Sequence, residues 1–364
     1  MKTNSPIEHI VIIVKENHTF DNYFGTFLGA NGDATLQHAP DPPSSDPPHE
    51  HGAWLRRASG AVRQQYVEAD IPDYFAYARQ FTLCDNYFTE IASQSEPNHL
   101  VLIAADSPII DNSSRQRTYQ PQAPFDLPSL PMGLEPAGLT WKSYGDPAFN
   151  YFDHIVALQG SQNIVPWTQF DQDAAAGSLP SVSWVYATRE FSEHPPDGSG
   201  TPAPVVMSGM RWTASRVEAV ARSGLWPSTT IIITWDDWGG WYDHVEAPLK
   251  DTWKGSGPSD GPSYTGTQFS YGPRVPCLVL SPYAKAGYVS KAFHSHASAV
   301  KLCELTFGLP PLSARDAAAD GMEDCFDFSQ KPLPAPISDQ DPAPSPKPSP
   351  HPGKKPRKRH RPKA

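Results

Sequence analysis

The sequence lacks both a long apolar run and a closely spaced cysteine pair. No stretch of 18 apolar residues occurs in its 364 residues, so we expect no membrane-spanning helix. The four cysteines show no C-x-x-C spacing, which argues against a zinc knuckle or a thioredoxin-like site. No signal peptide is recognisable, so the sequence as written predicts a cytoplasmic protein, or a secreted or periplasmic one if a leader was removed.

Basic residues are scarce outside the last part of the chain. The formal net charge is −10, but residues 351–364 carry seven Lys or Arg and no acidic residue, so the preceding chain sums to −17. An acidic body does not favour nucleic acid as a partner of the core. The basic end is suited to contact with an anionic surface, and a solvated solubility tail explains it equally well.

Proline is unevenly distributed and suggests where the folded part ends. The 41 prolines crowd residues 40–48 and everything after about residue 332. A segment rich in Pro, Ser and Lys cannot bury a core. We therefore predict one catalytic domain over residues 1–331 and a disordered, Pro-rich basic tail over residues 332–364.

Short β-branched runs alternate with helical segments along the chain. Residues 10–14 are five consecutive β-branched or aliphatic residues, typical of a strand buried on both faces, and residues 229–234 repeat the pattern. This alternation predicts an α/β fold with a doubly wound, mostly parallel sheet and long loops at its carboxyl edge. Further strands are expected at 81–88, 139–144, 182–186 and 275–280, and helices at 72–80, 210–222 and 297–307.

Polar residues follow both of these runs immediately. Glu16 and Asn17 follow the first run, and Asp236 and Asp237 follow the second. If the two strands are parallel neighbours, these side chains converge at the carboxyl edge, where clustered carboxylates repel one another unless a cation lies between them. A simple turn is the alternative for Asp236 and Asp237. The oxygen-rich set favours one divalent metal ion, with Ca²⁺, Mg²⁺ and Mn²⁺ preferred over Zn²⁺.

Ser95 precedes another apolar run, Leu100 to Ala105. This order predicts Ser95 at or just before a helix N-terminus, where backbone N–H groups favour a phosphate or an oxyanion. An ordinary N-cap serine is the alternative. A hydroxyl, a metal and strand-end histidines together can transfer a phosphoryl group through a covalent intermediate. The remaining loop histidines, His38, His49 and His51, are interpreted as solvated.

Several longer motifs resemble those of the phosphoesterase family, which contains bacterial phospholipases C, plant non-specific phospholipases C and an acid phosphatase branch. The opening motif is Glu16-Asn17-His18-Thr19-Phe20-Asp21-Asn22-Tyr23-Phe24-Gly25. Matching blocks follow in the family's order over roughly residues 7–328. They lie at 95–99, 192–195, 236–245, 296–301 and 307–312.

The resemblance implies a fold similar to that of alkaline phosphatases and sulfatases, and it implies roles for single residues. Ser95 would be the nucleophile that forms a phosphoserine, with Ser93 as the fallback. His154 is better explained as a structural histidine. The implied metal ligands are Glu16, Asn17, Ser95, Asp236 and Asp237, and the implied phosphate-binding or acid–base histidines are His194, His244 and His296.

The sequence thus predicts a metal-dependent phosphoric ester hydrolase, either phospholipase C-like or acid phosphatase-like. Its substrate would be a phosphate ester, with phospholipid as one option. A non-catalytic binding or surface protein on the same fold is an alternative. A sulfatase-like esterase is another, although residues 95–99 lack the Arg of the C/S-x-P-x-R motif.

Overall fold

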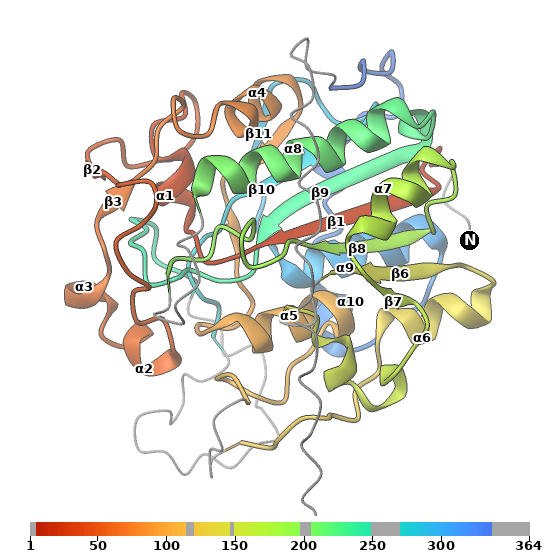
Figure 1. The fold of residues 1–364 in the computed structure, drawn as a ribbon, viewed down its shortest axis with the longest axis horizontal. Helices are drawn as coiled ribbons and strands as arrows, with labels where there is room; N and C mark the ends of the chain where they lie inside the picture. Colours follow the sequence, from red (N-terminus) through yellow and green to blue (C-terminus); the bar gives the residue numbers. More distant parts are fainter. Residues whose placement is uncertain (1–4, 114–119, 146–148, 197–204, 249–269, 337–364) are drawn as a thin grey trace, which may run out of the picture.

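The computed structural model describes residues 5–113, 120–145, 149–196, 205–248 and 270–336. Its main sheet is built from β1 (His9–Lys15), β4 (Thr82–Cys84), β6 (Trp141–Tyr144), β7 (Ile164–Val165), β8 (Val182–Tyr186), β9 (Thr229–Trp235), β10 (Cys277–Leu280) and β11 (Tyr288–Ser290). These strands follow one another across the sheet in the order β11-β4-β10-β9-β1-β8-β6-β7 (Figure 1). Two further pairs of strands are β2 (Gln37–His38) with β3 (Gln64–Gln65), and β5 (Tyr87–Phe88) with β12 (His294–Ser295).

The sheet is mixed and mostly parallel. Strand β1 pairs in parallel with both β8 and β9, and β6 pairs in parallel with β7 and β8. Only β10 runs against its neighbours β4 and β9, while β4 and β11 are parallel. The carboxyl ends of β1, β8 and β9 therefore lie at one edge of the sheet, as the sequence predicts.

The central strands form the core because both of their faces are apolar. Residues 10–13 of β1 and 231–233 of β9 are completely buried. Their register places Ile12 beside both Trp184 and Ile232. A strand buried on both faces needs helices on both sides, which explains the near-continuous aliphatic runs.

Helices lie on both faces of this sheet. On one side, α8 (Val206–Arg222) contacts α4 (Pro72–Gln80) and α7 (Thr168–Ala175). On the other, α5 (Ser95–Ala104) contacts α6 (Leu130–Leu134) and α9 (His296–Phe307), and α9 contacts α10 (Ala314–Ala318). Figure 1 shows α8 above the central strands β9 and β1, with α5, α9 and α10 below them. This arrangement confirms the predicted doubly wound α/β fold.

The short helices are α1 (Phe20–Phe24), α2 (His51–Trp54), α3 (Arg57–Gly60) and the 3-10 turns η1 (Glu135–Ala137), η2 (Tyr151–His154), η3 (Val156–Leu158), η4 (Trp226–Ser228) and η5 (Glu323–Cys325).

Two local predictions need correction. The single strand expected over 81–88 is divided into β4 and β5, because the chain leaves the main sheet after Cys84 and pairs Tyr87 with His294 of β12. Helix α8 begins at Val206, four residues before the predicted start. There, the carboxylate of Asp41 accepts hydrogen bonds from the backbone N–H groups of Val206 and Met207, a contact that only the tertiary structure supplies.

The first residues assigned to the tail contact the folded domain. The Leu333 N–H donates to the carbonyl of Pro282 at 2.8 Å, and the Trp226 indole N–H donates to the carbonyl of Leu333 at 3.1 Å. The remainder of the predicted tail, from residue 337 onward, lies outside the described residues.

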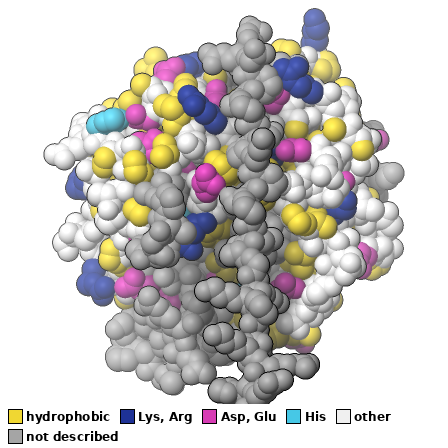
Figure 2. All heavy atoms as spheres, viewed as in Figure 1, with side chains coloured by type: hydrophobic (Ala, Val, Ile, Leu, Met, Phe, Trp, Pro, Cys, Tyr) yellow, Lys and Arg dark blue, Asp and Glu magenta, His cyan; other side chains and the backbone are white. Residues whose placement is uncertain are grey.

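The described surface carries both signs of charge. Figure 2 shows Lys and Arg side chains interspersed with Asp and Glu between apolar and neutral groups on the face in view. Within the described ranges, we find no helix with the length and apolar character needed to cross a bilayer.

A buried carboxyl pair between α9 and α10 makes stability depend on pH. Burial, followed by hydrogen bonding to Asp316, raises the pKa of Glu304 to about 8. Because this pKa lies above the value in the unfolded chain, the stabilisation is present at low pH and is lost as the pH rises from about 4.5 to 8.

We therefore expect Glu304→Gln to weaken the pH dependence of unfolding between pH 5 and 8, because the amide donates to Asp316 at every pH. The full pKa shift corresponds to roughly 3 to 4 kcal/mol over this range, and screening by solvent reduces the expected change to about 2 kcal/mol. Urea unfolding of wild type and variant across this range measures the difference. Glu323→Gln on η5 serves as the control. Identical pH profiles for Glu304→Gln and wild type would contradict the assignment.

Candidate active site

Three loops meet at the carboxyl edge of the sheet. The loop after β1 begins at Glu16, whose N–H donates to the carbonyl of Ser192 in the loop after β8 at 3.0 Å. The loop after β9 begins at Asp236, whose N–H donates to the carbonyl of Lys15 at 2.9 Å. The parallel strands thus bring together polar residues that are more than 200 positions apart in the sequence.

Three carboxylates, a hydroxyl and an imidazole converge where these loops meet the start of α5. Ser95 Oγ lies 3.2 Å from Asp237 Oδ2 and 3.4 Å from Glu16 Oε2. The Nε2 atom of His99 lies 3.3 Å from Glu16 Oε1 and 3.5 Å from Asp236 Oδ2. No more than 5% of any of the five residues is exposed, so their charges act on one another with little screening by water.

The close packing of the carboxyl groups and the imidazole shifts the pKa values of all four side chains. Burial and then the charge of Asp236 raise the pKa of Glu16 to about 7, and the same two causes raise the pKa of Asp237 well above its ordinary value. Although burial opposes ionisation, hydrogen bonding to His99 holds the pKa of Asp236 below its ordinary value. Burial likewise opposes the charging of His99, but hydrogen bonds to Asp236 and Glu16 raise its pKa to about 9. The imidazolium of His99 therefore neutralises only part of the acidic cluster.

Asn17 has a strained backbone beside this cluster. Its φ is +63°, in the left-handed region, and its N–H donates to Asp236 Oδ1 at 2.9 Å. The loop after β9 approaches so closely that a Cβ at Gly239 would lie 2.3 Å from the carbonyl oxygen of Asn17, so only glycine fits there. Backbone strain of this kind is typical of functional sites.

The donor set fits a divalent cation. Among the described residues, the buried oxygen Asn17 Oδ1 has no hydrogen-bond partner, and Asp236 Oδ2 has only the long 3.5 Å contact with His99 Nε2, although buried polar atoms are nearly always paired. Unpaired oxygens beside further carboxylates suit a hard metal ion. Glu16, Asn17, Ser95, Asp236 and Asp237 could hold it. His99 could replace one of them, since it forms a close donor group with Glu16 and Asp236.

The two candidate serines have different surroundings. Ser95 is the first residue of α5, and its hydroxyl faces Glu16 and Asp237. The hydroxyl of Ser93 instead donates to Asp111 Oδ1 at 2.6 Å. Asn98 holds the intervening turn by accepting from the N–H of Ile91 at 2.9 Å and donating to its carbonyl at 3.1 Å. These contacts favour Ser95 over Ser93 as the nucleophile.

The three predicted acid–base histidines occupy different places. His296 lies beside the cluster, with Nε2 2.7 Å from the carbonyl of Asp236 and Nδ1 3.1 Å from the hydroxyl of Tyr87. Both of its ring nitrogens are engaged, and burial lowers its pKa to about 4, so it is suited to positioning Asp236. His244 contacts Asp21 at 2.7 Å and Asn31 at 3.2 Å instead.

His194 has one ring nitrogen available. Its Nδ1 lies 2.6 Å from the carbonyl of Pro195, and its ring lies beside that of His49, with centroids 6.3 Å apart. His49 Nε2 in turn lies 3.4 Å from Asn17 Nδ2, which connects this pair to the carboxylate cluster. Burial lowers the pKa of His194. Its Nε2 is therefore the ring nitrogen best placed to exchange a proton with a substrate.

The other histidines correct or extend the sequence analysis. His49 and His51 are buried rather than solvated, because the Pro-rich loop packs back onto the loop after β9, whereas the ring of His38 is exposed. His154 contacts Glu96 at 2.6 Å, in keeping with a structural role. His99 was not among the site residues predicted from the sequence. Its position four residues after Ser95, one turn along α5, was the available signal.

A buried ion pair holds two of the loops together. Lys15 Nζ lies 3.2 Å from Glu193 Oε1, and both side chains are fully buried. Glu193 also accepts hydrogen bonds from the hydroxyls of Tyr23 and Tyr74, each at 2.7 Å. Because Lys15 precedes Glu16 and Glu193 precedes His194, this pair fixes the relative position of the carboxylate cluster and the histidine loop.

Comparison with known proteins identifies relatives over most of the chain. The sequence model of the Phosphoesterase family matches residues 7–43 and 45–310. The chain is 26% identical over 404 residues to a non-hemolytic phospholipase C of Pseudomonas aeruginosa, covering 89% of this chain and 57% of that protein. It is 27% identical over 424 residues to phospholipase C B of Mycobacterium tuberculosis, covering 90% of this chain and 79% of that protein. The chain thus spans little more than half the length of the Pseudomonas protein.

Solved structures have lower sequence identity to the chain. A protein in the alkaline phosphatase superfamily from Vibrio parahaemolyticus is 12% identical, covers 88% of this chain and 71% of its own, and has a TM-score of 0.48. Murine ectonucleotide pyrophosphatase / phosphodiesterase 5 is 9% identical, covers 88% of this chain and 100% of its own, and has a TM-score of 0.49.

The buried ion pair yields a stability prediction. Lys15→Met should lower the free energy of unfolding by about 3 to 5 kcal/mol, because it leaves Glu193 buried without its cation. The double variant Lys15→Met/Glu193→Gln should recover part of this loss, since no buried charge remains. Urea denaturation of the two single variants and the double variant measures the coupling.

The exposed pair Arg222–Glu218 on α8 provides the control. Arg222→Ala should change stability far less, because a pair in contact with water contributes little. Additive effects of the Lys15 and Glu193 substitutions would contradict the coupling.

Proposed function

Because the chain belongs to the phosphoesterase family, we propose that it is a metal-dependent phosphoric ester hydrolase of the phospholipase C type with Ser95 as its nucleophile. The observation that carries this proposal is the position of the Ser95 hydroxyl at the start of α5, between the carboxylates of Glu16 and Asp237. The family match spans all of these residues. A binding protein would have no need for a hydroxyl held between mutually repelling carboxylates.

The metal would be held by Glu16, Asn17, Asp236 and Asp237 together with Ser95. Two observations support this ligand set: the unpartnered Oδ1 of Asn17 beside the weakly paired Oδ2 of Asp236, and the raised pKa of Glu16 and Asp237. When bound, a divalent ion lowers the pKa of a coordinated hydroxyl and polarises a phosphoryl oxygen. Its identity is left open among Ca²⁺, Mg²⁺, Mn²⁺ and Zn²⁺, with the oxygen-rich donors favouring the harder ions.

In the first step, Ser95 Oγ forms a bond to phosphorus while the bond from phosphorus to the alcohol oxygen breaks. The Ser95 proton passes to Asp237, whose Oδ2 lies 3.2 Å away, and the departing alcohol takes a proton from the charged form of His194. In the second step, water cleaves the phosphoserine and gives a proton to His194, while Ser95 regains its own proton from Asp237. The products are the alcohol and the phosphate species, and the enzyme returns to its starting state.

Phospholipid is the substrate class that the relatives favour, since the two bacterial proteins described above are both named phospholipases C. A simpler phosphomonoester requires the same nucleophile and the same metal. The leaving alcohol is a diacylglycerol in the first case and a small alcohol in the second. The basic end of the chain, proposed to contact anionic surfaces, lies outside the described residues.

Ester hydrolysis by matched serine variants tests the nucleophile. Ser95→Ala should lower kcat on the preferred ester by at least about 1,000-fold, because no covalent intermediate can form. Ser93→Ala, two residues away, is the matched control and should change kcat less than about tenfold. The substrates are p-nitrophenyl phosphate and p-nitrophenyl phosphorylcholine, at acidic and neutral pH. Full activity of Ser95→Ala on both would contradict the mechanism, and no turnover by wild type of either ester would contradict the function.

Metal removal tests the ligand set separately. Dialysis against a chelator should abolish turnover, and adding back one divalent ion at a time should restore it and identify the ion. Asp237→Asn should weaken metal binding in a calorimetric titration, because it removes one anionic ligand. Glu246→Gln, an exposed carboxylate after the same strand, is the control. Retention of activity after complete metal removal would refute the metal requirement while leaving the role of Ser95 open.

A further inference from the structure

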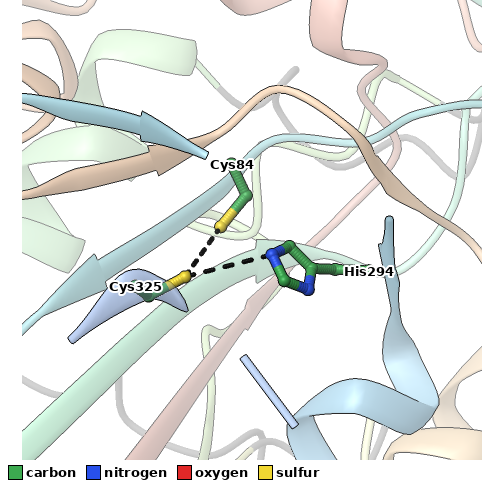
Figure 3. Close-up of side chains that lie close together, drawn as sticks. All are labelled: Cys84, His294 and Cys325. Atoms are coloured by element: carbon green, nitrogen blue, oxygen red, sulfur yellow. Dashed lines mark hydrogen bonds between the residues drawn. The ribbon is translucent and has the colours of Figure 1, made fainter. Parts of the chain in front are cut away.

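A second group of metal-binding side chains lies at the outer part of the sheet. Cys84 is the last residue of β4, His294 the first of β12, and Cys325 the last of η5, and all three are fully buried. Figure 3 shows the sulfur of Cys325 facing both the sulfur of Cys84 and the imidazole of His294. Both cysteines are free thiols. Their positions 84, 294 and 325 are too far apart for any local sequence motif to reveal the group.

Asp324 completes the group with an oxygen atom. Its Oδ2 accepts hydrogen bonds from the Ser290 hydroxyl at 2.5 Å and the Tyr288 hydroxyl at 3.2 Å. Its Oδ1 is thereby turned toward the other donors, 3.3 Å from His294 Nε2 and 3.6 Å from Cys325 Sγ. Asp324 Oδ1 therefore lies next to the nitrogen of His294 and the sulfur of Cys325, at the edge of the group formed by Cys84, His294 and Cys325.

The separations around Cys325 Sγ and His294 Nε2 are close to the edges of a tetrahedron around zinc. Zinc bonds of about 2.3 Å to sulfur and 2.0–2.2 Å to nitrogen and oxygen imply edges of roughly 3.8 Å between sulfurs, 3.6 Å from sulfur to nitrogen or oxygen, and 3.4 Å from nitrogen to oxygen. The sulfurs of Cys84 and Cys325 are 3.7 Å apart, and Cys325 Sγ is 4.0 Å from His294 Nε2. The Cys84 sulfur lies within 4.8 Å of the His294 donor atom as well.

The surroundings orient the imidazole for binding through Nε2. Asp320 Oδ1 lies 2.7 Å from His294 Nδ1; this carboxylate–histidine contact lacks hydrogen-bond geometry, but it places a negative charge beside Nδ1 and leaves Nε2 to bind a metal. Ser290 Oγ lies 3.0 Å from Nε2, so this hydroxyl must turn away when a metal binds. The side chains of Asp320 and Asp324 are 40% and 29% exposed, which gives an ion access from solvent.

We propose that Cys84, His294, Asp324 and Cys325 bind one Zn²⁺ ion as a structural site. Two thiolates and an imidazole are soft or borderline ligands, which select zinc over the harder ions suited to the carboxylate cluster. Binding converts both thiols to thiolates and displaces the Nε2 proton of the ion-paired His294, which releases three protons to solvent. Four protein ligands leave no position for a substrate, so the site holds structure and performs no reaction.

The site would join three segments that are far apart in the sequence. It ties η5, near the end of the described chain, to β4 at the sheet and to β12. His294 lies two residues before His296, which begins α9 and contacts the carbonyl of Asp236. Zinc would therefore fix the base of α9 behind the candidate active site. This inference does not depend on the proposed hydrolase activity.

Cobalt substitution in the full-length protein provides the test. After removal of bound metal, titration with CoCl₂ under reducing conditions should give a thiolate-to-cobalt charge-transfer band and the strong visible absorption of a tetrahedral ion. Cys84→Ser and Cys325→Ser should each abolish or strongly reduce the band. Cys303→Ser, a buried cysteine of α9 outside the group, is the matched control and should leave the band unchanged. Cobalt at the carboxylate cluster gives no such band, so Ser95→Ala should retain it.

A second variant, at the partly exposed residue Asp320, tests the site without replacing a buried cysteine, because such a replacement can itself disrupt folding. Asp320→Asn should lower the zinc affinity about 10- to 100-fold in competition with a chromophoric chelator, while the cobalt band persists at saturation. In the wild type, zinc removal should lower Tm by at least about 4 °C.

Three results would overturn the site. One is the absence of a thiolate-to-cobalt band in reduced wild type at saturating cobalt. In that case His294 would only form an ion pair with its carboxylate neighbours, and Cys84 and Cys325 would be ordinary buried thiols. Another is an unchanged band in both cysteine variants. The third is a Cys84–Cys325 disulfide in peptide mapping of freshly isolated protein together with no bound zinc, since the sulfurs would then have closed to about 2.05 Å.

Discussion

Mutual repulsion among three buried carboxylates is the constraint on which the functional end of this fold depends. Glu16, Asp236 and Asp237 lie together without water to screen them, and His99 supplies only one compensating charge. Such a group is unfavourable for folding unless a cation joins it. Its presence at the ends of two buried central strands is therefore better explained by function than by stability.

The rest of the site is arranged to hold this unfavourable cluster in place. The Lys15–Glu193 ion pair fixes the loop after β8 against the loop after β1. The left-handed backbone of Asn17 fits because Gly239 has no side chain. His296, on α9, holds the carbonyl of Asp236 from the other side. Rigid strands, a strained turn and buried hydrogen bonds together prevent the carboxylates from moving apart, as preorganised catalytic sites require.

Much of the fold could be predicted from the sequence because its signals are local. The aliphatic run at residues 10–14 identified β1, and Pro72 at a first helical turn identified α4 with the bounds seen in the structure. The strand predicted over 81–88 failed because its division depends on pairing between Tyr87 and His294, a contact across more than 200 residues. The reversed direction of β10 likewise leaves no mark in its four apolar residues.

The sequence by itself determined which residues end the central strands, and hence that Glu16, Asn17, Asp236 and Asp237 would share one edge of a parallel sheet. It also placed Ser95 at a helix start, because the apolar run at residues 100–105 is typical of the start of a buried helix. Only the tertiary structure decided that His99 enters the carboxylate cluster, that His244 contacts Asp21, and that Cys84, His294 and Cys325 meet. The physical reason is range: strand and helix ends follow from neighbouring residues, whereas such meetings depend on how distant loops pack.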